Sequence, residues 1–343
     1  MIYPWQHDDW DRLQRLRAQW PHALLLYGQA GIGKLKFAQH LAQGMLCEAP
    51  AANGEPCGQC VACNWFAQGN HPDYRALLPE TLAGEASAAG ASASEEKADG
   101  EEGKKTRTLS KEIKIEQVRA LLDFCGVGAH RGGARVVLVY PADALNAASA
   151  NALLKTLEEP PAGVVFLLVS ARVDRLLPTI ISRCRQWPMS TPSPERARAW
   201  LAEQGVHDAG ALLAEAGGAP LAALALAADE SRPLRDFTLK QLAAGAQCDA
   251  FACGEALQKL PVPVVLGWLQ RWLYDLVAEC AAQRPRYFPG AQRELARCAQ
   301  HIDANAFARF MKTVTRERAV ESHPLNARLV FESLFLGYRD LFV

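Results

Sequence analysis

Residues 23–34 read ALLLYGQAGIGK, and this stretch decides the fold. Its first five residues form a short, continuous apolar run, which is typical of a strand buried on both faces of a parallel sheet. Gly28, Gly31, Gly33 and Lys34 then fit the pattern G-x-x-x-x-G-K. Glycines at this spacing let backbone N–H groups close around a phosphate, the next helix presents its positive end, and the lysine reaches the terminal phosphates. The alternative is a glycine turn that only joins a strand to a helix.

The motif departs from an ATP-hydrolysing site at two places. Leu35 follows the lysine, where a hydroxyl side chain would ligate Mg²⁺, and a leucine cannot coordinate a metal. The strand expected at residues 135–139 is followed by Tyr140 and Pro141, where an aspartate and a glutamate would complete the site, and Asp143 comes too late. Without a metal ligand or a catalytic acid, phosphoryl transfer loses most of its electrostatic stabilisation. We expect no ATP hydrolysis by this chain alone, and whether the loop binds nucleotide stays open.

Strands and helices alternate over the first half of the chain. Apolar runs predict further strands, and helical patterns predict the helices between them: strands at residues 135–140 and 164–170, and helices at residues 34–45, 115–124 and 149–157. Such alternation indicates an α/β domain with a parallel sheet and helices on both faces.

A proline-rich segment at residues 187–194 ends this alternation, and everything after it reads as helical. Ser193 is expected to cap a helix that begins at Pro194. Gly217 and Gly218 interrupt two short helices. Longer helices are expected at residues 264–283, 304–318 and 326–340. The spacing of five aliphatic residues predicts one face of the last helix: Leu325, Leu329, Val330, Leu334 and Leu336.

Composition and charge limit the classes of function. The 343 residues predict two or three domains, and half of them are hydrophobic, which excludes global disorder. Lys+Arg and Asp+Glu both number 37, so no strongly basic field collects nucleic acid unaided. About residues 81–108, rich in Ala, Gly, Ser and Glu, we expect a disordered surface loop. The first ten residues lack an apolar signal core and no stretch reads as a membrane span, so we expect a soluble, cytoplasmic protein.

Four of the ten cysteines form a cluster in the sequence: Cys47, Cys57, Cys60 and Cys63, with the spacing C-x9-C-x2-C-x2-C. In a reducing compartment such pairs indicate thiolate ligands more than disulfides. Four thiolates complete the tetrahedral coordination of zinc and leave no position for a catalytic water, so the metal is expected to be structural. An iron–sulfur cluster and unliganded cysteines are the alternatives. The other six cysteines are expected in the core.

Two further strings carry a resemblance to a known family. Residues 151–161 read NALLKTLEEPP, and residues 174–184 read DRLLPTIISRC. Together with the phosphate loop and the cysteines, they resemble the AAA+ subunits of the bacterial clamp loader of DNA polymerase III. The resemblance covers the whole chain and is weakest in residues 81–108 and in the C-terminal third. It implies an α/β AAA+ fold, with a RecA-like parallel P-loop sheet, over residues 1–188.

The departures from the motif distinguish two kinds of subunit within this family. The motor subunits, gamma and tau, have intact phosphate loops and an Asp-Glu pair, whereas the delta-prime kind has a degenerate site. Leu35, Tyr140 and Pro141 resemble the second kind, and residues 218–222 also lack an arginine that motor subunits carry there. The resemblance implies a subunit that hydrolyses no ATP by itself but belongs to the DNA-directed DNA polymerase holoenzyme, a nucleotidyltransferase. The alternative is an active ATPase of the gamma/tau kind.

The resemblance also implies a role for Arg183. In this family the arginine of Ser-Arg-Cys points across a subunit interface into a neighbour's ATP site, where its guanidinium stabilises charge on the transferred phosphoryl group. The alternative is a surface ion pair. Lys155, Glu158 and Glu159 look catalytic in isolation, but a helix that ends before Pro160 explains their spacing without chemistry.

The remaining architecture and the partners follow from the same resemblance. It implies a zinc module at about residues 47–63, a small helical lid at residues 189–230 and a helical collar at residues 231–343. The collar would join a ring with delta and gamma/tau subunits, which loads the sliding clamp onto primer–template DNA, and this chain would be a non-catalytic stator. A stand-alone zinc-dependent nucleic-acid binder is a further alternative, which the zero net charge disfavours.

Overall fold

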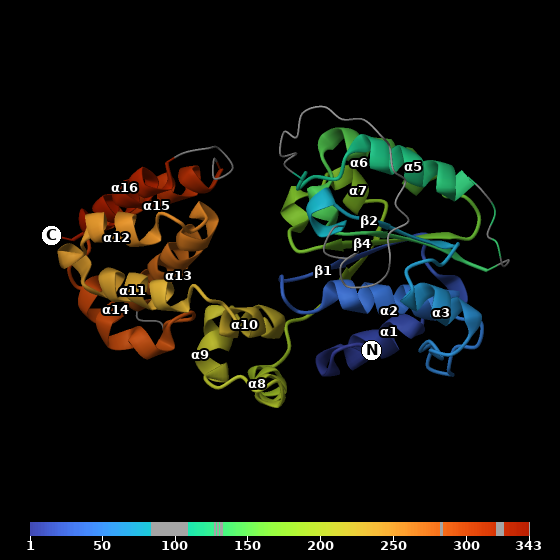
Figure 1. The fold of residues 1–343 in the computed structure, drawn as a ribbon, viewed down its shortest axis with the longest axis horizontal. Helices are drawn as coiled ribbons and strands as arrows, with labels where there is room; N and C mark the ends of the chain where they lie inside the picture. Colours follow the sequence, from blue (N-terminus) through green and yellow to red (C-terminus); the bar gives the residue numbers. More distant parts are fainter. Residues whose placement is uncertain are drawn as a thin grey trace, which may run out of the picture. The chain divides into compact units, whose positions relative to one another are not determined.

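The computed structural model of the chain describes residues 1–83, 109–126, 128, 130, 133–281, 284–319 and 326–342. The chain divides into two compact units, Met1–Pro192 and Ser193–Val343. Both are drawn in Figure 1, and each is described below by itself. Of the loop expected at about residues 81–108, residues 81–83 complete a helical turn, and residues 84–108 lie outside the described residues.

The described part of the first unit contains a parallel sheet of five strands in the order β2-β3-β4-β1-β5. The strands are β1 (Ala23–Tyr27), β2 (Tyr74–Leu77), β3 (Arg135–Val139), β4 (Val164–Ser170) and β5 (Arg185–Pro188). All residues of β3 and β4 and the first four of β1 are buried, as continuous apolar runs predict for the central strands of a parallel sheet. The predicted parallel α/β fold and its three predicted strands are therefore confirmed.

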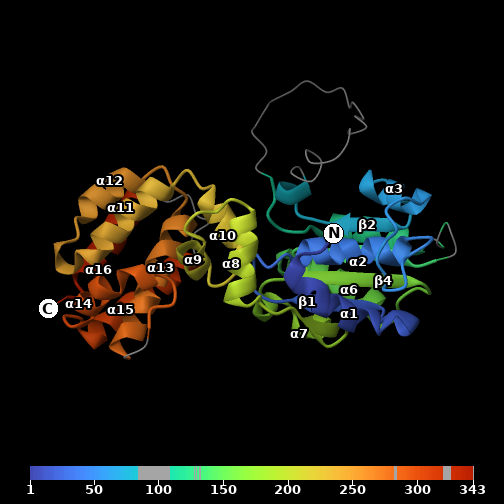
Figure 2. The ribbon, with the colours of Figure 1, turned by 90° about the horizontal axis from the view of Figure 1, so that it is seen from below.

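Helices cover both faces of this sheet, as Figure 1 shows. Six α-helices with assigned bounds are described: α1 (His7–Gln14), α2 (Lys34–Leu46), α3 (Val61–Ala67), α5 (Ile115–Gly126), α6 (Ala147–Glu158) and α7 (Pro178–Ile181). Alternate strand residues, such as Leu25, Val137 and Phe166, form one buried cluster with Val118 of α5 and Leu153 of α6. The intervening strand residues point to the opposite face, where α2 lies across the strands (Figure 2).

The described part of the second unit contains helices and no strand of its own. Its α-helices are α8 (Pro194–Glu203), α9 (Ala209–Glu215), α10 (Pro220–Ala227), α11 (Arg232–Ala243), α12 (Ala250–Leu257), α13 (Val262–Cys280), α14 (Gln292–Ala299), α15 (Ala304–Ala319) and α16 (Ala327–Arg339). The hydroxyl of Ser193 accepts a hydrogen bond from the backbone N–H of Arg196, 3.4 Å away, so the predicted cap is confirmed. Gly217 and Gly218 separate α9 from α10 with positive φ angles.

Two separate hydrophobic clusters stabilise the second unit. One joins α8, α9 and α10 through residues such as Leu201, Leu212 and Ala223. The other joins α11 to α16 around Trp272 and Tyr338. The contacts between residues define a single boundary in the chain, after Pro192. The three-domain division at residues 188 and 230 stays a prediction.

The predicted apolar face of α16 is confirmed at Leu334, which is buried, and at Val330 and Leu336, which pack partly buried against the core, but it is wrong at Leu329. The buried residues of this helix are Phe331, Leu334, Phe335 and Tyr338, which recur at the helical period, whereas Leu329 is 62% exposed. Leu325 lies outside the described residues. The prediction counted only aliphatic residues, but the aromatic side chains bury the larger apolar surface and therefore set the inward face.

No single helix among the described residues is both long and apolar enough to cross a membrane. Helices α9 and α10 meet these criteria only when they are taken together, and the pair is bent by 113°.

Candidate functional site

The phosphate loop joins β1, near the middle of the sheet, to the first turn of α2. Gly33 has a φ of +88° and is the residue before the helix. A Cβ atom on Gly28 would lie 2.4 Å from the carbonyl oxygen of Met189, so only glycine fits there. The strand before the loop and the helix after it give the loop the context that its sequence predicted.

Lys34 is turned back onto its own loop. Its Nζ atom donates hydrogen bonds to the carbonyl oxygens of Gly28, 2.8 Å away, and Gln29, 2.7 Å away. The residue is 6% exposed, and burial lowers the pKa of its ammonium group to about 8, partly offset by the negative charge of Asp143. The loop's own carbonyls thus hold the cation that a phosphate would otherwise attract.

Three N-terminal residues that the sequence reasoning missed cover the loop. The indole N–H of Trp5 and the amide of Gln6 each donate to the carbonyl oxygen of Ile32, 3.0 Å away. The ring of Tyr3 stacks on that of Trp5 with centroids 4.9 Å apart, and a Cβ on Gly33 would lie 2.4 Å from the Tyr3 ring. The sequence did not predict this contact, because these three residues lie before the first strand and belong to no helical or strand pattern.

The positions of the metal ligand and the catalytic acids carry residues that cannot perform those roles: Leu35, Tyr140 and Pro141. The nearby carboxylate of Asp143 is held at the end of β4, where its Oδ1 atom accepts a hydrogen bond from the Ser170 hydroxyl at 2.7 Å. Burial and the charge of Asp143 raise the pKa of the Tyr140 phenol, which therefore stays neutral at physiological pH. At these three positions no side chain supplies the hydroxyl or carboxylate that would ligate Mg²⁺ next to the lysine.

The four predicted metal ligands come together in space. The sulfur atoms of Cys47, Cys57, Cys60 and Cys63 all lie within 4.8 Å of one another. The Sγ atoms of Cys47 and Cys57 are 3.5 Å apart, and those of Cys47 and Cys60 are 3.9 Å apart. Zinc–sulfur bonds of ~2.3 Å in a tetrahedron require sulfur atoms ~3.8 Å apart, so the cluster can hold a metal of this kind.

Local structure builds this four-cysteine cluster. Cys47 directly follows α2, Cys60 directly precedes α3, and Cys63 lies in the first turn of α3. The backbone N–H groups of Gln59 and Cys60 donate to the Cys57 sulfur and lower the pKa of its thiol to about 6, which favours the thiolate that a metal binds. Burial raises the pKa of the Cys63 thiol to about 12, and a metal would have to displace its proton.

The six remaining cysteines were expected in the core, and five of them are buried: Cys125, Cys184, Cys248, Cys253 and Cys298. Cys280 is exposed, at the end of α13, so that expectation is wrong for this residue. Burial raises the pKa of the Cys184 thiol to about 12, as for an inert packing residue.

Arg183 follows α7 and binds groups of its own chain. Its Nη2 atom forms an ion pair with Oε1 of Glu158, and its Nη1 atom donates to the carbonyl oxygen of Thr179, 2.9 Å away. The ion pair of the alternative interpretation is therefore present. Glu158 is the last residue of α6, and the backbone N–H of Glu159 closes the helix on the carbonyl of Lys155, so the predicted helix end is confirmed.

The sheet separates Arg183 from the phosphate loop. Strands β1 and β5 are parallel, with Leu24 opposite Arg185 and Tyr27 opposite Pro188. The loop leaves the carboxyl end of β1, whereas Arg183 precedes the amino end of β5. At ~3.3 Å per residue the strand spans about 16 Å, so the arginine lies at the opposite edge of the sheet from its own loop.

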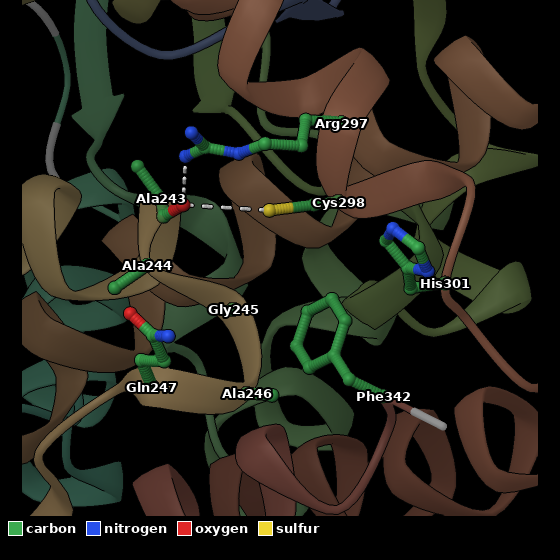
Figure 3. Close-up of a pocket in the computed structure, with 9 residues that line it drawn as sticks. All are labelled: Ala243, Ala244, Gly245, Ala246, Gln247, Arg297, Cys298, His301 and Phe342. Carbon is green, nitrogen blue, oxygen red and sulfur yellow. Dashed lines mark hydrogen bonds between the residues drawn. The ribbon is translucent and has the colours of Figure 1, made fainter.

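A hollow of about 340 Å³ in the second unit is drawn in Figure 3. The guanidinium of Arg297 donates to the carbonyl oxygen of Ala243, 2.9 Å away, and the Cys298 thiol lies 3.6 Å from the same oxygen. Ala243 ends α11, where backbone carbonyls have no partner within the helix. These side chains therefore complete a helix end, and we assign the hollow no ligand.

Comparison with known proteins places these features in one family. Residues 6–193 match the family described as DNA polymerase III, delta subunit. The chain is similar to the DNA polymerase III subunit delta' of Pseudomonas aeruginosa, with 40% identity over 287 residues that cover 80% of this chain and 77% of the relative. It is 31% identical to the Escherichia coli subunit delta' over 345 residues, which cover 97% of this chain and 94% of the relative.

A second kind of subunit is also similar to part of the chain. The Escherichia coli DNA polymerase III subunit tau is 32% identical over 177 residues, which cover 52% of this chain and 23% of tau. The two delta' relatives cover more of this chain than tau does.

Proposed function

The chain belongs to the delta-prime family of DNA polymerase III subunits, within the bacterial clamp-loader AAA+ proteins, and from this premise we propose that it is the non-catalytic stator of a clamp loader. The observation that carries the proposal is the degenerate phosphate site. Leu35, Tyr140 and Pro141 replace the groups that would hold Mg²⁺ and activate water, and Lys34 is bound by the loop's own carbonyl oxygens. A site of this kind lacks the electrostatic stabilisation that phosphoryl transfer needs.

The proposal is tested by measuring ATP turnover by the purified chain with Mg²⁺. We expect a rate at the background of the assay. Magnesium-dependent turnover that is lost in a Lys34→Met variant would instead support the alternative, an active ATPase of the gamma/tau kind.

We further propose that Arg183 acts as an arginine finger in the ATP site of a neighbouring subunit. Its place at the edge of the sheet remote from its own loop supports action in trans, since the guanidinium cannot serve the loop of its own chain. Fingers of this kind accelerate phosphoryl transfer by ~10³–10⁵ at the site they serve.

The finger is tested in the reconstituted ring with delta and gamma/tau subunits. An Arg183→Ala variant should lower the ATP hydrolysis rate that the clamp and DNA stimulate. Arg185→Ala, two residues away and also accessible, is the matched control and should keep the wild-type rate. Equal rates for wild type and Arg183→Ala would exclude the finger.

We propose that the four-cysteine cluster holds a structural zinc ion. Cys47, Cys57, Cys60 and Cys63 supply four sulfur donors at suitable separations, which leaves no position for a catalytic water. The zinc would tie the end of α2 to α3 and so stabilise the module that follows the phosphate-loop helix.

We propose that the partners are the delta and gamma/tau subunits in a cytoplasmic ring, and through that ring the sliding clamp and primer–template DNA. The zero net charge supports a subunit that mainly contacts proteins. Mixing the chain with delta and gamma/tau should give a stable ring, and clamp loading should depend on this chain. Tight, salt-sensitive DNA binding by the chain alone would favour a stand-alone nucleic-acid binder.

A further inference from the structure

Three acceptors of its own chain occupy the guanidinium of Arg183. The Nη2 atom donates to Oε1 of Glu158, and the Nη1 atom donates to the carbonyl oxygen of Thr179 at 2.9 Å and to the hydroxyl of Ser182 at 3.3 Å. The Nε atom is buried and has no hydrogen-bond partner among the described residues. A guanidinium has five N–H groups, so two are left, and because the one on Nε is buried, only one N–H on Nη2 is open to a further ligand.

This occupancy conflicts with tight phosphate binding. Arginine recognises phosphate most strongly with two parallel N–H groups. In the described conformation Arg183 can offer only one, so it must give up a contact before it can hold a phosphate with two. The carboxylate of Glu158 is the contact that a phosphate would replace, because both are anions that pair with the same Nη2 atom.

The ion pair between Arg183 and Glu158 is accessible to water, so another anion can replace the carboxylate. The side chains of Arg183 and Glu158 are 31% and 48% exposed, respectively, and ion pairs with such access to water contribute little to stability. The two residues lie on neighbouring elements, since Glu158 ends α6 and Arg183 follows α7, which contacts α6 (Figure 1). The pair can therefore open without disturbing the buried cluster beneath these helices.

We propose that Glu158 is a latch: its carboxylate holds the Arg183 finger in cis until the terminal phosphate in the neighbour's ATP site replaces it. The latch rests on the trans role of Arg183 proposed above. It makes Glu158 a positioning residue that acts through the arginine. Removal of the charge at position 158 should therefore make the finger easier to engage.

The chain itself offers a matched control for this test. Glu159 is the next residue and an exposed carboxylate, and it has no ion pair among the described residues. Glu158→Gln and Glu159→Gln remove the same charge from adjacent positions and preserve the shape of each side chain. A difference between the two variants reports the contact with Arg183 and not a general change in surface charge.

The first measurement uses the isolated chain. Phenylglyoxal modifies accessible arginines, and the rate at Arg183 can be followed by mass spectrometry of peptides. We expect severalfold faster modification in Glu158→Gln than in wild type and in Glu159→Gln. Equal rates in all three proteins would overturn the latch. This measurement needs neither the ring nor ATP hydrolysis, so its outcome is independent of the finger role.

The second measurement uses the reconstituted ring. Glu158→Gln should raise kcat/KM for ATP severalfold, Glu159→Gln should match wild type, and Glu158→Gln should have no effect in an Arg183→Ala background. An unchanged or lower kcat/KM in Glu158→Gln would overturn the latch, because a merely structural role cannot raise it. If Arg183→Ala alone has no effect, the finger role fails, and the modification rates still decide whether Glu158 restrains Arg183.

Discussion

The Nζ atom of Lys34 lies 2.8 Å from the carbonyl oxygen of Gly28, a residue of the same phosphate loop. A second bond joins it to Gln29, and the residue is 6% exposed. The amine is thus buried with acceptors that are dipoles and not full negative charges. Burial consequently outweighs the nearby charge of Asp143, and the pKa of Lys34 falls to about 8 from its ordinary value of 10.5.

This pKa predicts a pH dependence of stability. Between pH 8 and 10.5 the folded chain has released a proton that the unfolded chain still holds, so the free energy of unfolding gains a contribution as pH rises through this window. Lys34→Met removes that contribution. The free energy of unfolding of wild type minus that of the variant should increase from pH 8 to pH 10, by up to about 1.4 kcal/mol for each pH unit. Urea unfolding at several pH values measures this difference, and parallel pH profiles for both proteins would contradict it.

The four-cysteine cluster predicts one zinc ion that depends on each thiolate. Cys60→Ser should lower the zinc content, measured by elemental mass spectrometry, well below one ion per chain. Removal of metal by a chelator should lower the Tm of wild type, because a structural metal binds the folded state and not the unfolded chain.

Cys280→Ser is the control for the zinc experiment, because the Cys280 thiol is exposed and lies outside the cluster. It should keep the full zinc content and the wild-type Tm. Unchanged, stoichiometric zinc in Cys60→Ser would remove the assignment. Bound iron with visible absorption would favour an iron–sulfur cluster instead.

The central strands could be predicted from the sequence, but the edge strands could not. β1, β3 and β4 are continuous apolar runs because the sheet buries both of their faces. β5 reads RQWP and exposes three of its four residues, and β2 exposes two of its four. These edge strands form because β1 and β3 offer them backbone hydrogen-bonding partners. The sequence of an edge strand alone does not reveal such a partner.

The candidate site was predictable only where its residues are close in the sequence. The cysteine spacing and the glycine loop are local, and the structure brings each set together. Glu158, the partner of Arg183, lies 25 residues away in the sequence. The end of a helix is enough to explain the spacing of the charged residues around Glu158, so the sequence does not point to this ion pair. Likewise, the buried ion pair of Asp73 with Arg135, 3.3 Å apart, joins residues 62 positions apart at the start of an otherwise apolar strand.

The phenol of Tyr338 organises the core of the helical unit, which predicts the effect of removing its hydroxyl. The group accepts a hydrogen bond from the indole N–H of Trp272 at 2.9 Å and donates one to the carbonyl oxygen of Leu242 at 2.7 Å. Tyr338→Phe leaves both partners buried without that oxygen, so the free energy of unfolding should fall by ~1–3 kcal/mol. Tyr274→Phe, at a residue 48% exposed, should change it by no more than ~0.5 kcal/mol. Urea unfolding of both variants checks the contrast, and equal losses would contradict it.

The contact between Gly33 and Tyr3 predicts that the phosphate loop cannot accept a side chain. Gly33→Ala would place an L residue at a φ of +88°, which costs ~1–2 kcal/mol, and would put its Cβ atom 2.4 Å from the Tyr3 ring. Gly69→Ala is the matched control in the same unit, with a φ of +74° and no atom within 4 Å of the added Cβ. Both variants should lower the Tm, and Gly33→Ala should lower it further because Tyr3 must leave its stack on Trp5. Equal shifts would show that the N-terminal segment does not cover the loop in solution.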